Sequence, residues 1–315
     1  MIGAATDIAV HVQGLIRRFG SLSAVSNVNL DIARGEIFGL VGPDGAGKTT
    51  IMRVLAGVLR PNAGTVTIEG IDVVAMPELA KSQISYMPQR FGLYEDLTVA
   101  ENIFFYGELF SVPRAIRRER TGALVDAAGL RGFEHRLAGQ LSGGMKQKLG
   151  LICALIHTPK VLLLDEPTTG VDPVSRRDFW AILYGLCEEG VTIILSTAYM
   201  DEAERCSRLA LVSGGEIHHC DTPAKLKQAM PGALLAVSAD NPRAARDALV
   251  GAPGVLGLLL MGDRVNVRVD DADMREPELR ERLAGRAIPV MAITPVEPAI
   301  EDVFVALLGK ERRDG

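Results

Sequence analysis

The chain has 315 residues, 48% hydrophobic and 23% charged, which is typical of a globular protein with room for two domains. A formal net charge of −5 does not favour nucleic acid as the main ligand, and no apolar run approaches the ~18 residues needed to span a bilayer. We therefore expect a soluble, cytosolic chain with no nucleic acid partner and four reduced cysteines, which would meet any membrane through a partner.

Strand patterns open the chain. Residues 28–32 alternate between apolar and polar, and residues 37–41 form an apolar run that ends at a glycine. A helical pattern follows over residues 49–59 and is closed by the turn at 60–64. The loop between the apolar strand and this helix, residues 42–49, reads GPDGAGKT and matches the P-loop pattern in its required context.

The P-loop predicts nucleotide binding. Its glycines let backbone N–H groups surround phosphates, and the helix N-terminus adds positive potential. We expect Lys48 to pair with the β- and γ-phosphates of ATP and the Thr49 hydroxyl to ligate Mg²⁺. The alternative, a chance glycine-rich turn, is disfavoured by this context. The expected nucleotide contacts of this segment are Gly42, Pro43, Asp44, Gly45, Ala46, Gly47, Lys48, Thr49 and Thr50.

Helical patterns dominate from about 90 to 150, and apolar runs return at 161–165 and 192–196, each followed by a helix. Such an alternation predicts a parallel sheet buried on both faces. The first of these runs ends in Asp165 and Glu166. We expect Asp165 to hold Mg²⁺ through water and Glu166 to act as general base on the attacking water. With the P-loop, this pair constitutes a Walker B motif.

A different pattern follows residue 223, with strands and helices in the order β-α-β-β-α-β, which is the ferredoxin-like arrangement. We assign residues 1–227 to a nucleotide-binding domain and 228–315 to a small α+β domain. The second domain shows no obvious catalytic constellation.

The sequence LSGGMKQKLGLICAL begins at Leu141. Ser142 is a natural helix N-cap, and Gly143 and Gly144 leave backbone N–H groups exposed, which would suit a second phosphate contact. This start resembles the signature of ABC-type ATPases, where it completes the ATP site of a partner subunit. The resemblance covers roughly residues 8–222.

The resemblance implies an α/β P-loop NTPase fold with a parallel core sheet, an antiparallel β subdomain and a helical subdomain at about 90–150. Phe19 fits the aromatic residue that stacks on adenine, and Gln89 fits the glutamine that senses Mg²⁺ and water. In isolation they would be a core aromatic and a surface amide. Residues 170–172 fit the D-loop, with Asp172 among the nucleotide contacts. Thr49, Gln89 and Asp165 are the implied metal ligands.

The segment PVEPAIEDVFVALL, residues 295–308, resembles the tails of ATPase subunits of ABC-2-type exporters. GVDPVSRRDFW and STAYMDEAER resemble the N-terminal half of tandem-ATPase exporters of the YbhF type. This implies an ATPase that powers transport through a separate permease at the cytoplasmic face of the inner or plasma membrane. The alternative is a regulatory or structural subunit that binds ATP with little hydrolysis. A further alternative, a protein of translation or DNA repair, is less consistent with a chain that has a single cassette and a negative net charge.

Three positions depart from the family's pattern. Asp44 replaces the usual Asn, and we expect it to point to solvent, while Cys153 replaces the usual Arg. Ala198 occupies the position of the switch histidine, whose imidazole contacts the γ-phosphate. A homodimer would have two sites without this histidine. The favoured partner is therefore a second ATPase subunit that carries one, with a homodimer as the alternative.

Six aromatic residues are clustered at the start of the helical segment. They could form the core of the helical subdomain, or a groove that receives a cytoplasmic helix of a permease, and both interpretations could hold for different members. The group consists of Phe91, Tyr94, Phe104, Phe105, Tyr106 and Phe110.

Overall fold

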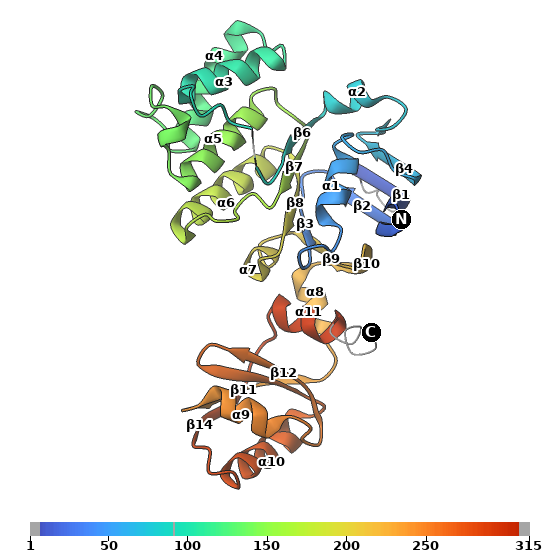
Figure 1. Ribbon diagram of the computed structural model, residues 1–315, viewed down its shortest axis with the longest axis vertical. Helices are drawn as coiled ribbons and strands as arrows, with labels where there is room; N and C mark the ends of the chain where they lie inside the picture. The colour runs from blue at the N-terminus through green and yellow to red at the C-terminus, as the bar shows by residue number, and fades with distance from the viewer. Residues whose placement is uncertain (1–6, 91, 309–315) are drawn as a thin grey trace, which may run out of the picture. The chain divides into compact units, whose positions relative to one another are not determined.

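The computed structural model describes residues 7–90 and 92–308, and these form two compact units that divide between Thr222 and Pro223 (Figure 1). The boundary expected after residue 227 falls within helix α8 (Pro223–Gln228), which belongs to the second unit. Within the described ranges, no helix combines the length and the apolar character that a membrane crossing requires.

A six-stranded sheet forms the centre of the first unit, in the order β10-β9-β3-β8-β7-β6. The middle strands β3 (Ile37–Val41), β7 (Val161–Asp165) and β8 (Thr192–Thr197) are buried at every residue. They pair in parallel with one another and with β6 (Ile84–Met87) and β9 (Arg208–Ser213). Only β10 (Glu216–Asp221) is antiparallel. The predicted parallel core sheet is confirmed.

Helices cover both faces of this sheet. In Figure 1, α1 (Lys48–Leu55) lies on one side of the strands and α6 (Pro173–Glu188) on the other. Apolar side chains on both faces explain the continuous apolar runs of the strands. The helix predicted over residues 49–59 ends at Leu55, and Gly57 just beyond it takes a positive φ of 66° that ends the regular helix.

A second, antiparallel sheet packs beside α1, in the order β2-β1-β4-β5. Its apolar face shares one core with α1 and with the central sheet, including Leu15, Ile32 and Met52. A short helix, α2, follows it. The bounds are β1 (Ile8–Phe19), β2 (Leu22–Ala33), β4 (Ala63–Ile68), β5 (Ile71–Asp72) and α2 (Pro77–Lys81).

The helical subdomain consists of α3 (Val99–Leu109), α4 (Arg114–Ala127), η1 (Ala138–Gln140) and α5 (Gly143–Leu155). Thr98 and Glu101 form a capping box that starts α3, since each side chain accepts from the other residue's backbone N–H. The subdomain has an apolar core of its own, which contains Cys153.

The predicted aromatic group divides between the core and the surface of this subdomain. Tyr106 packs partly against the core, whereas Tyr94, Phe104 and Phe110 are 47%, 56% and 39% exposed. The ring of Phe105 meets Tyr94 edge-on at 4.7 Å between centroids. Phe91 lies outside the described residues.

The second unit contains a four-stranded antiparallel sheet in the order β12-β13-β11-β14. Helices α9 and α10 share an apolar core with one face of this sheet, which is the predicted ferredoxin-like arrangement. The bounds are β11 (Ala233–Ala239), α9 (Pro242–Leu249), β12 (Val255–Met261), β13 (Arg264–Val269), α10 (Ala272–Ala284), β14 (Val290–Pro295) and α11 (Ile300–Leu308).

Candidate nucleotide-binding site

A cavity of about 940 Å³ opens beside the P-loop, where β3 and β8 reach their carboxyl ends. Ligands of α/β sheets bind at this edge because loops and helix N-termini converge there. The cavity brings together most of the residues predicted from sequence. Its lining residues are Phe19, Leu22, Ser23, Ala24, Asp44, Gly45, Ala46, Gly47, Lys48, Thr49, Thr50, Gln89, Glu166, Thr169, Ala198, Tyr199, Gly214 and Gly215.

The P-loop follows a path that only glycine permits at two positions. At Gly42, a Cβ atom would lie 2.1 Å from the carbonyl oxygen of Val212. Gly47 has a φ of 104°, and its Cβ would lie 2.5 Å from the carbonyl oxygen of Ala24. Side chains at either position would therefore push the loop away from its neighbours.

Lys48 is almost fully buried beneath the loop, and its ammonium group stabilises the loop through hydrogen bonds to backbone carbonyl groups. Its Nζ donates to the carbonyl oxygens of Gly42 at 2.7 Å and Pro43 at 3.0 Å. The same Nζ lies 3.4 Å from Oε1 of Glu166. The ammonium group is thus held at the floor of the cavity, where it can reach phosphate oxygens.

Glu166 and Gln89 meet at the cavity, although 77 positions separate them in the chain. The Gln89 Nε2 donates to Oε2 of Glu166 at 3.0 Å. Glu166 has a φ of 49°, in the left-handed region that a residue with a Cβ rarely adopts. This conformation turns the chain sharply after β7 and places the carboxylate in the cavity wall. A carboxylate at this position is able to accept a proton from a water molecule beside it.

Asp165 is fully buried and accepts hydrogen bonds from three hydroxyl groups. Thr49 Oγ1 and Ser196 Oγ donate to its Oδ1 at 3.0 and 2.6 Å, and the Tyr86 hydroxyl donates to its Oδ2 at 3.2 Å. Burial, and then the negative charge of Asp165, raise the pKa of Tyr86 to about 12. Tyr86 is therefore a neutral donor at physiological pH, and it holds the carboxylate in place.

Sequence reasoning missed Ser196 and Tyr86. Ser196 is the cross-strand partner of Asp165 in the β7–β8 register, and its Oγ also accepts from the backbone N–H of Glu166 at 3.0 Å. The available signal was a polar residue at the end of an apolar run. Without the strand register, this signal does not reveal its partner.

Thr49, Asp165 and Gln89 form a set of hard oxygen donors. The Thr49 hydroxyl, the Asp165 carboxylate and the amide oxygen of Gln89 are the ligand types that suit Mg²⁺. Thr49 and Asp165 already lie in hydrogen-bond contact. The donor chemistry therefore fits a divalent cation beside the P-loop.

At the position expected for a switch histidine, Ala198 is exposed on the cavity wall. The neighbouring Tyr199 also lines the cavity, and the guanidinium carbon of Arg176 lies 4.6 Å from its ring centroid. No histidine of the described residues lines this cavity. The wall therefore presents a methyl group here.

A buried carboxylate, Glu202, lies behind Ala198 in the short helix α7 (Met200–Ala203). Its Oε2 accepts from Thr197 Oγ1 at 2.8 Å, and its Oε1 accepts from the Thr168 hydroxyl and from the Trp180 indole. Glu202 thus ties the segment that follows Glu166 to the residue that precedes Ala198.

Phe19 and Asp44 both line the cavity beside the P-loop. Phe19 is 46% exposed on the cavity rim, and the guanidinium carbon of Arg17 lies 4.6 Å from its ring centroid. Asp44 is exposed.

The signature residues and the D-loop are not part of this cavity lining. Ser142 caps α5 by accepting from the backbone N–H of Met145 at 3.3 Å. Asp172 caps α6 by accepting from two backbone N–H groups, and its bond from Ser175 is the main cause of its lowered pKa. The structure does not bring Leu141, Ser142, Gly143, Gly144 or Asp172 to the P-loop of the same chain.

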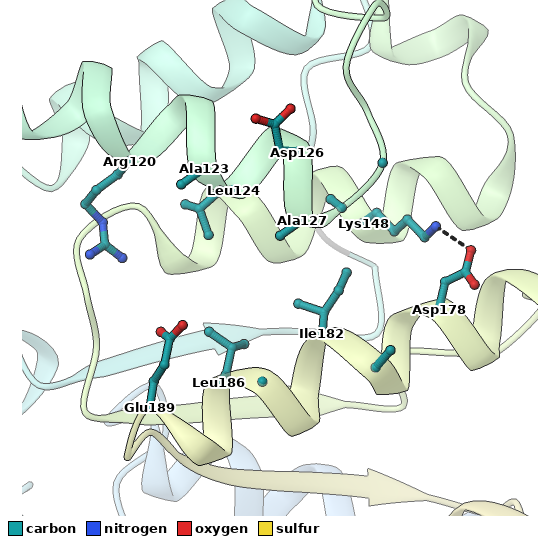
Figure 2. Close-up of a pocket in the computed structure, with 14 residues that line it drawn as sticks. Arg120, Ala123, Leu124, Asp126, Ala127, Lys148, Asp178, Ile182, Leu186 and Glu189 are labelled. Atoms are coloured by element: carbon teal, nitrogen blue, oxygen red, sulfur yellow. Dashed lines mark hydrogen bonds and ion pairs between the residues drawn. The ribbon is translucent and has the colours of Figure 1, made fainter.

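A separate cavity of about 570 Å³ lies between α4, α5 and α6 (Figure 2). Figure 2 shows Lys148 of α5 reaching Asp178 of α6, with 2.9 Å between Lys148 Nζ and Asp178 Oδ2. None of the predicted site residues lines this cavity. Lys48 and Thr49, which are expected to meet phosphate and Mg²⁺, line the cavity beside the P-loop instead.

A P-loop, a Walker B pair, an antiparallel β subdomain and a helical subdomain that begins α5 with LSGG define an ATP-binding cassette. A sequence profile described as "ABC transporter" matches residues 25–169. The chain belongs to the ATP-binding proteins of ABC transporters, as the following relatives show.

Two curated relatives match nearly the whole chain. The probable multidrug ABC transporter ATP-binding protein YbhF of Escherichia coli (strain K12) is 41% identical over 96% of this chain, which spans 52% of that relative. The daunorubicin/doxorubicin resistance ATP-binding protein DrrA of Streptomyces peucetius is 32% identical over 97% of this chain and 94% of its own length. The chain therefore spans about half of the first relative and nearly all of the second.

A solved structure shows the same fold for the cassette. It is a dimeric ATP-binding cassette in a post-hydrolysis state, bound to ADP and phosphate, and 27% identical to this chain. The match covers 68% of this chain and 98% of that one, with a TM-score of 0.61.

Proposed function

We propose that this chain is the ATP-hydrolysing subunit of an ABC-2-type exporter that powers transport through a separate membrane permease. The convergence of Lys48, Gln89 and Glu166 on the cavity beside the P-loop carries this proposal. The two curated relatives add support, because their names associate them with multidrug transport and with daunorubicin/doxorubicin resistance.

Binding begins with the P-loop backbone and Lys48, which offer N–H donors and an ammonium group to the phosphates of ATP. The ring of Phe19 would stack on adenine. Thr49, Gln89 and, through water, Asp165 would hold Mg²⁺, which neutralises phosphate charge when bound. Glu166, oriented by the Gln89 amide, would accept the proton of the attacking water.

A Glu166→Gln substitution tests the assignment of the base. The amide keeps the size and the backbone position but cannot accept the proton, so we expect ATP turnover to fall by about 100-fold or more. Nucleotide affinity should stay near that of the unmodified chain. Phosphate release and equilibrium binding of a fluorescent ATP analogue provide the two measurements.

The matched control is Glu204→Gln, which changes an exposed glutamate at the C-terminal end of α7 that does not line the cavity. Its turnover should match that of the unmodified chain. Equal turnover in the Glu166→Gln variant would contradict the assignment.

A second chain is needed to complete the site. Because residues 141–144 do not line the cavity of their own chain, we infer that they close the ATP site of a partner, head to tail. Exposed backbone N–H groups at the start of α5 suit the γ-phosphate of that site.

Ala198 favours a second candidate, a subunit that binds ATP with little hydrolysis of its own. Pairing with a different ATPase that carries a histidine at this position would give one ATP site that contains both the histidine and the signature residues. We therefore favour a heterodimer, with self-association as the alternative.

The permease is proposed to dock on the helical subdomain. Tyr94, Phe104 and Phe110 expose aromatic surface there, and aromatic residues are enriched at protein interfaces. This contact would hold the chain at the cytoplasmic face of the membrane. Affinity purification of the tagged chain from its native cells should recover a polytopic membrane protein, and recovery of ribosomes or DNA in its place would contradict the partner class.

A further inference from the structure

The second unit contains a cavity of about 280 Å³ that the nucleotide chemistry does not use. It lies between the sheet and α11, on the face opposite to the α9 and α10 core. The alternation along β13 explains this, since Val265, Val267 and Val269 join that core while Asn266 and Arg268 line the cavity. Its walls are otherwise mainly apolar: Leu234, Leu256, Leu258, Leu259, Val305 and Ala306.

One end of this cavity presents hydrogen-bond acceptors. Asp302 and Asn266 are only 6% and 4% exposed, and Asn266 Nδ2 donates to Asp302 Oδ1 at 3.0 Å. The second carboxylate oxygen accepts from the backbone N–H of Ala299 at 2.9 Å. Both donors are neutral, and no cationic side chain of the described residues pairs with Asp302.

The amide oxygen of Asn266 adds a second acceptor to this end. It is buried and has no hydrogen-bond partner in the described structure. A buried acceptor without a donor costs free energy, and a buried carboxylate without a cation costs more. The two groups together therefore suit a ligand with a cationic group that carries several N–H donors.

The other charged group of the cavity is Arg268. Its side chain crosses Gly257, and its Nη atoms donate to the carbonyl oxygens of Pro231 at 3.4 Å and Leu256 at 3.2 Å. Burial lowers the pKa of Arg268. No carboxylate of the described residues pairs with it. Since residues two apart on a strand have Cα atoms about 7 Å apart and share a face, Arg268 and Asn266 line the same cavity.

We propose that this cavity binds a small zwitterion with an aliphatic body, of the class of the aliphatic α-amino acids. The ammonium group would donate to Asp302 and to the free Asn266 Oδ1, and the carboxylate would accept from Arg268. The aliphatic side chain would pack among the leucines. A cavity of about 280 Å³ lies just below the usual range of small-molecule sites, which excludes larger ligands.

Charge pairing distinguishes a zwitterion from a singly charged ligand. An amine alone would leave Arg268 without an anion, and a carboxylic acid alone would leave Asp302 without a cation. The acid strands the buried Asp302 carboxylate without a cation, which is unfavourable, and the amine forgoes the contact with the half-buried Arg268. Only a ligand with both groups satisfies the two ends together.

Calorimetric titration of the full chain tests this with three matched probes. These are L-leucine, isopentylamine, which lacks the carboxylate, and 4-methylpentanoate, which lacks the ammonium group. We expect saturable binding of leucine and at least about tenfold weaker binding of each analogue. An analogue that binds as tightly as leucine, or no saturable signal up to about 10 mM leucine, would overturn the proposal.

Variants locate the binding. Arg268→Gln should lower the affinity for leucine by at least about tenfold and leave the affinity for isopentylamine unchanged, because only the carboxylate contact is lost. The matched control is Arg264→Gln, an exposed position on the same strand that does not line the cavity. If Arg264→Gln lowers the affinity for leucine as much as Arg268→Gln does, the proposed position of the site is wrong.

Asp302→Asn should abolish leucine binding, with Glu301→Gln as its neighbour control on α11. Since Asp302 also holds the start of α11, this variant could lose its fold, which circular dichroism would reveal. Ala306→Leu provides an independent arm, because it fills the cavity with apolar atoms and removes no charge. Leucine binding that survives in a folded Ala306→Leu chain would contradict the assignment.

Discussion

Ala198 places a methyl group on the cavity wall where the family pattern predicts a histidine. A donor aimed at charge that develops in the transition state typically contributes a factor of about 10²–10³ to the rate. A methyl group contributes none of this. The neighbouring Tyr199 contacts Arg176 through its ring. We therefore propose that the ATP site of this chain turns over slowly.

Ala198→His should restore such a donor. The exposed position has room for an imidazole, and we expect the ATP turnover of the purified chain to rise by about tenfold or more. Steady-state phosphate release measures this. Ala198→Leu, which adds bulk without a donor, should give no gain. Full activity in the unmodified self-associated chain, or no gain with histidine, would contradict the inferred need for a different partner.

At the scale of elements, the start of α5 is shaped by its close packing on α6. A Cβ atom on Gly144 would lie 2.4 Å from Oγ and 2.5 Å from Cβ of Ser175. Gly143 meets nothing closer than the carbonyl oxygen of Gly170 at 3.9 Å. The two signature glycines therefore differ: Gly144 allows the helices to approach, whereas a Cβ atom on Gly143 would meet no clash.

Gly144→Ala should accordingly lower the free energy of unfolding by about 1–3 kcal/mol through overpacking. Gly143→Ala, the matched control, should leave stability unchanged or slightly raised, since alanine favours helix. Urea unfolding at equilibrium provides both values. Adding Ser175→Gly to Gly144→Ala should recover part of the loss, and equal losses in the two single variants would contradict this account.

Local motifs could be predicted from sequence, and contacts between distant elements could not. The P-loop works through consecutive backbone groups, so residues 42–49 reveal it directly. The Asp165 network depends on the β7–β8 register, which no local pattern specifies. Glu202 lies in an acid-rich helix start that looks solvent-exposed, yet Thr168, Thr197 and Trp180 enclose it. The contacts of Asp165 and Glu202 are determined by strand order and burial, which no local sequence pattern reveals.

At the scale of the whole molecule, the two units have separate cores. The apolar cluster around the P-loop domain draws only on residues up to 217, and that of the ferredoxin-like sheet only on residues from 233. Each set encloses its own sheet and helices, as an independently folding domain does.

Fragments that end at residue 222 and begin at 223 should therefore fold separately. We expect each to unfold cooperatively on heating, and the first to retain the ATP affinity of the full chain. Circular dichroism melts and equilibrium nucleotide binding check this. A second fragment without a cooperative transition, or a first fragment without affinity, would show that the units depend on each other.

The position of residues 141–144 away from their own P-loop has a genetic consequence. In a self-associated dimer of the proposed kind, a Lys48 lesion disables the site of its own chain, and a Ser142 lesion disables the site of its neighbour. A mixed dimer of the two mutant chains therefore collects both lesions in one site and leaves the other intact. Two alleles that are each inactive alone would complement one another when expressed together.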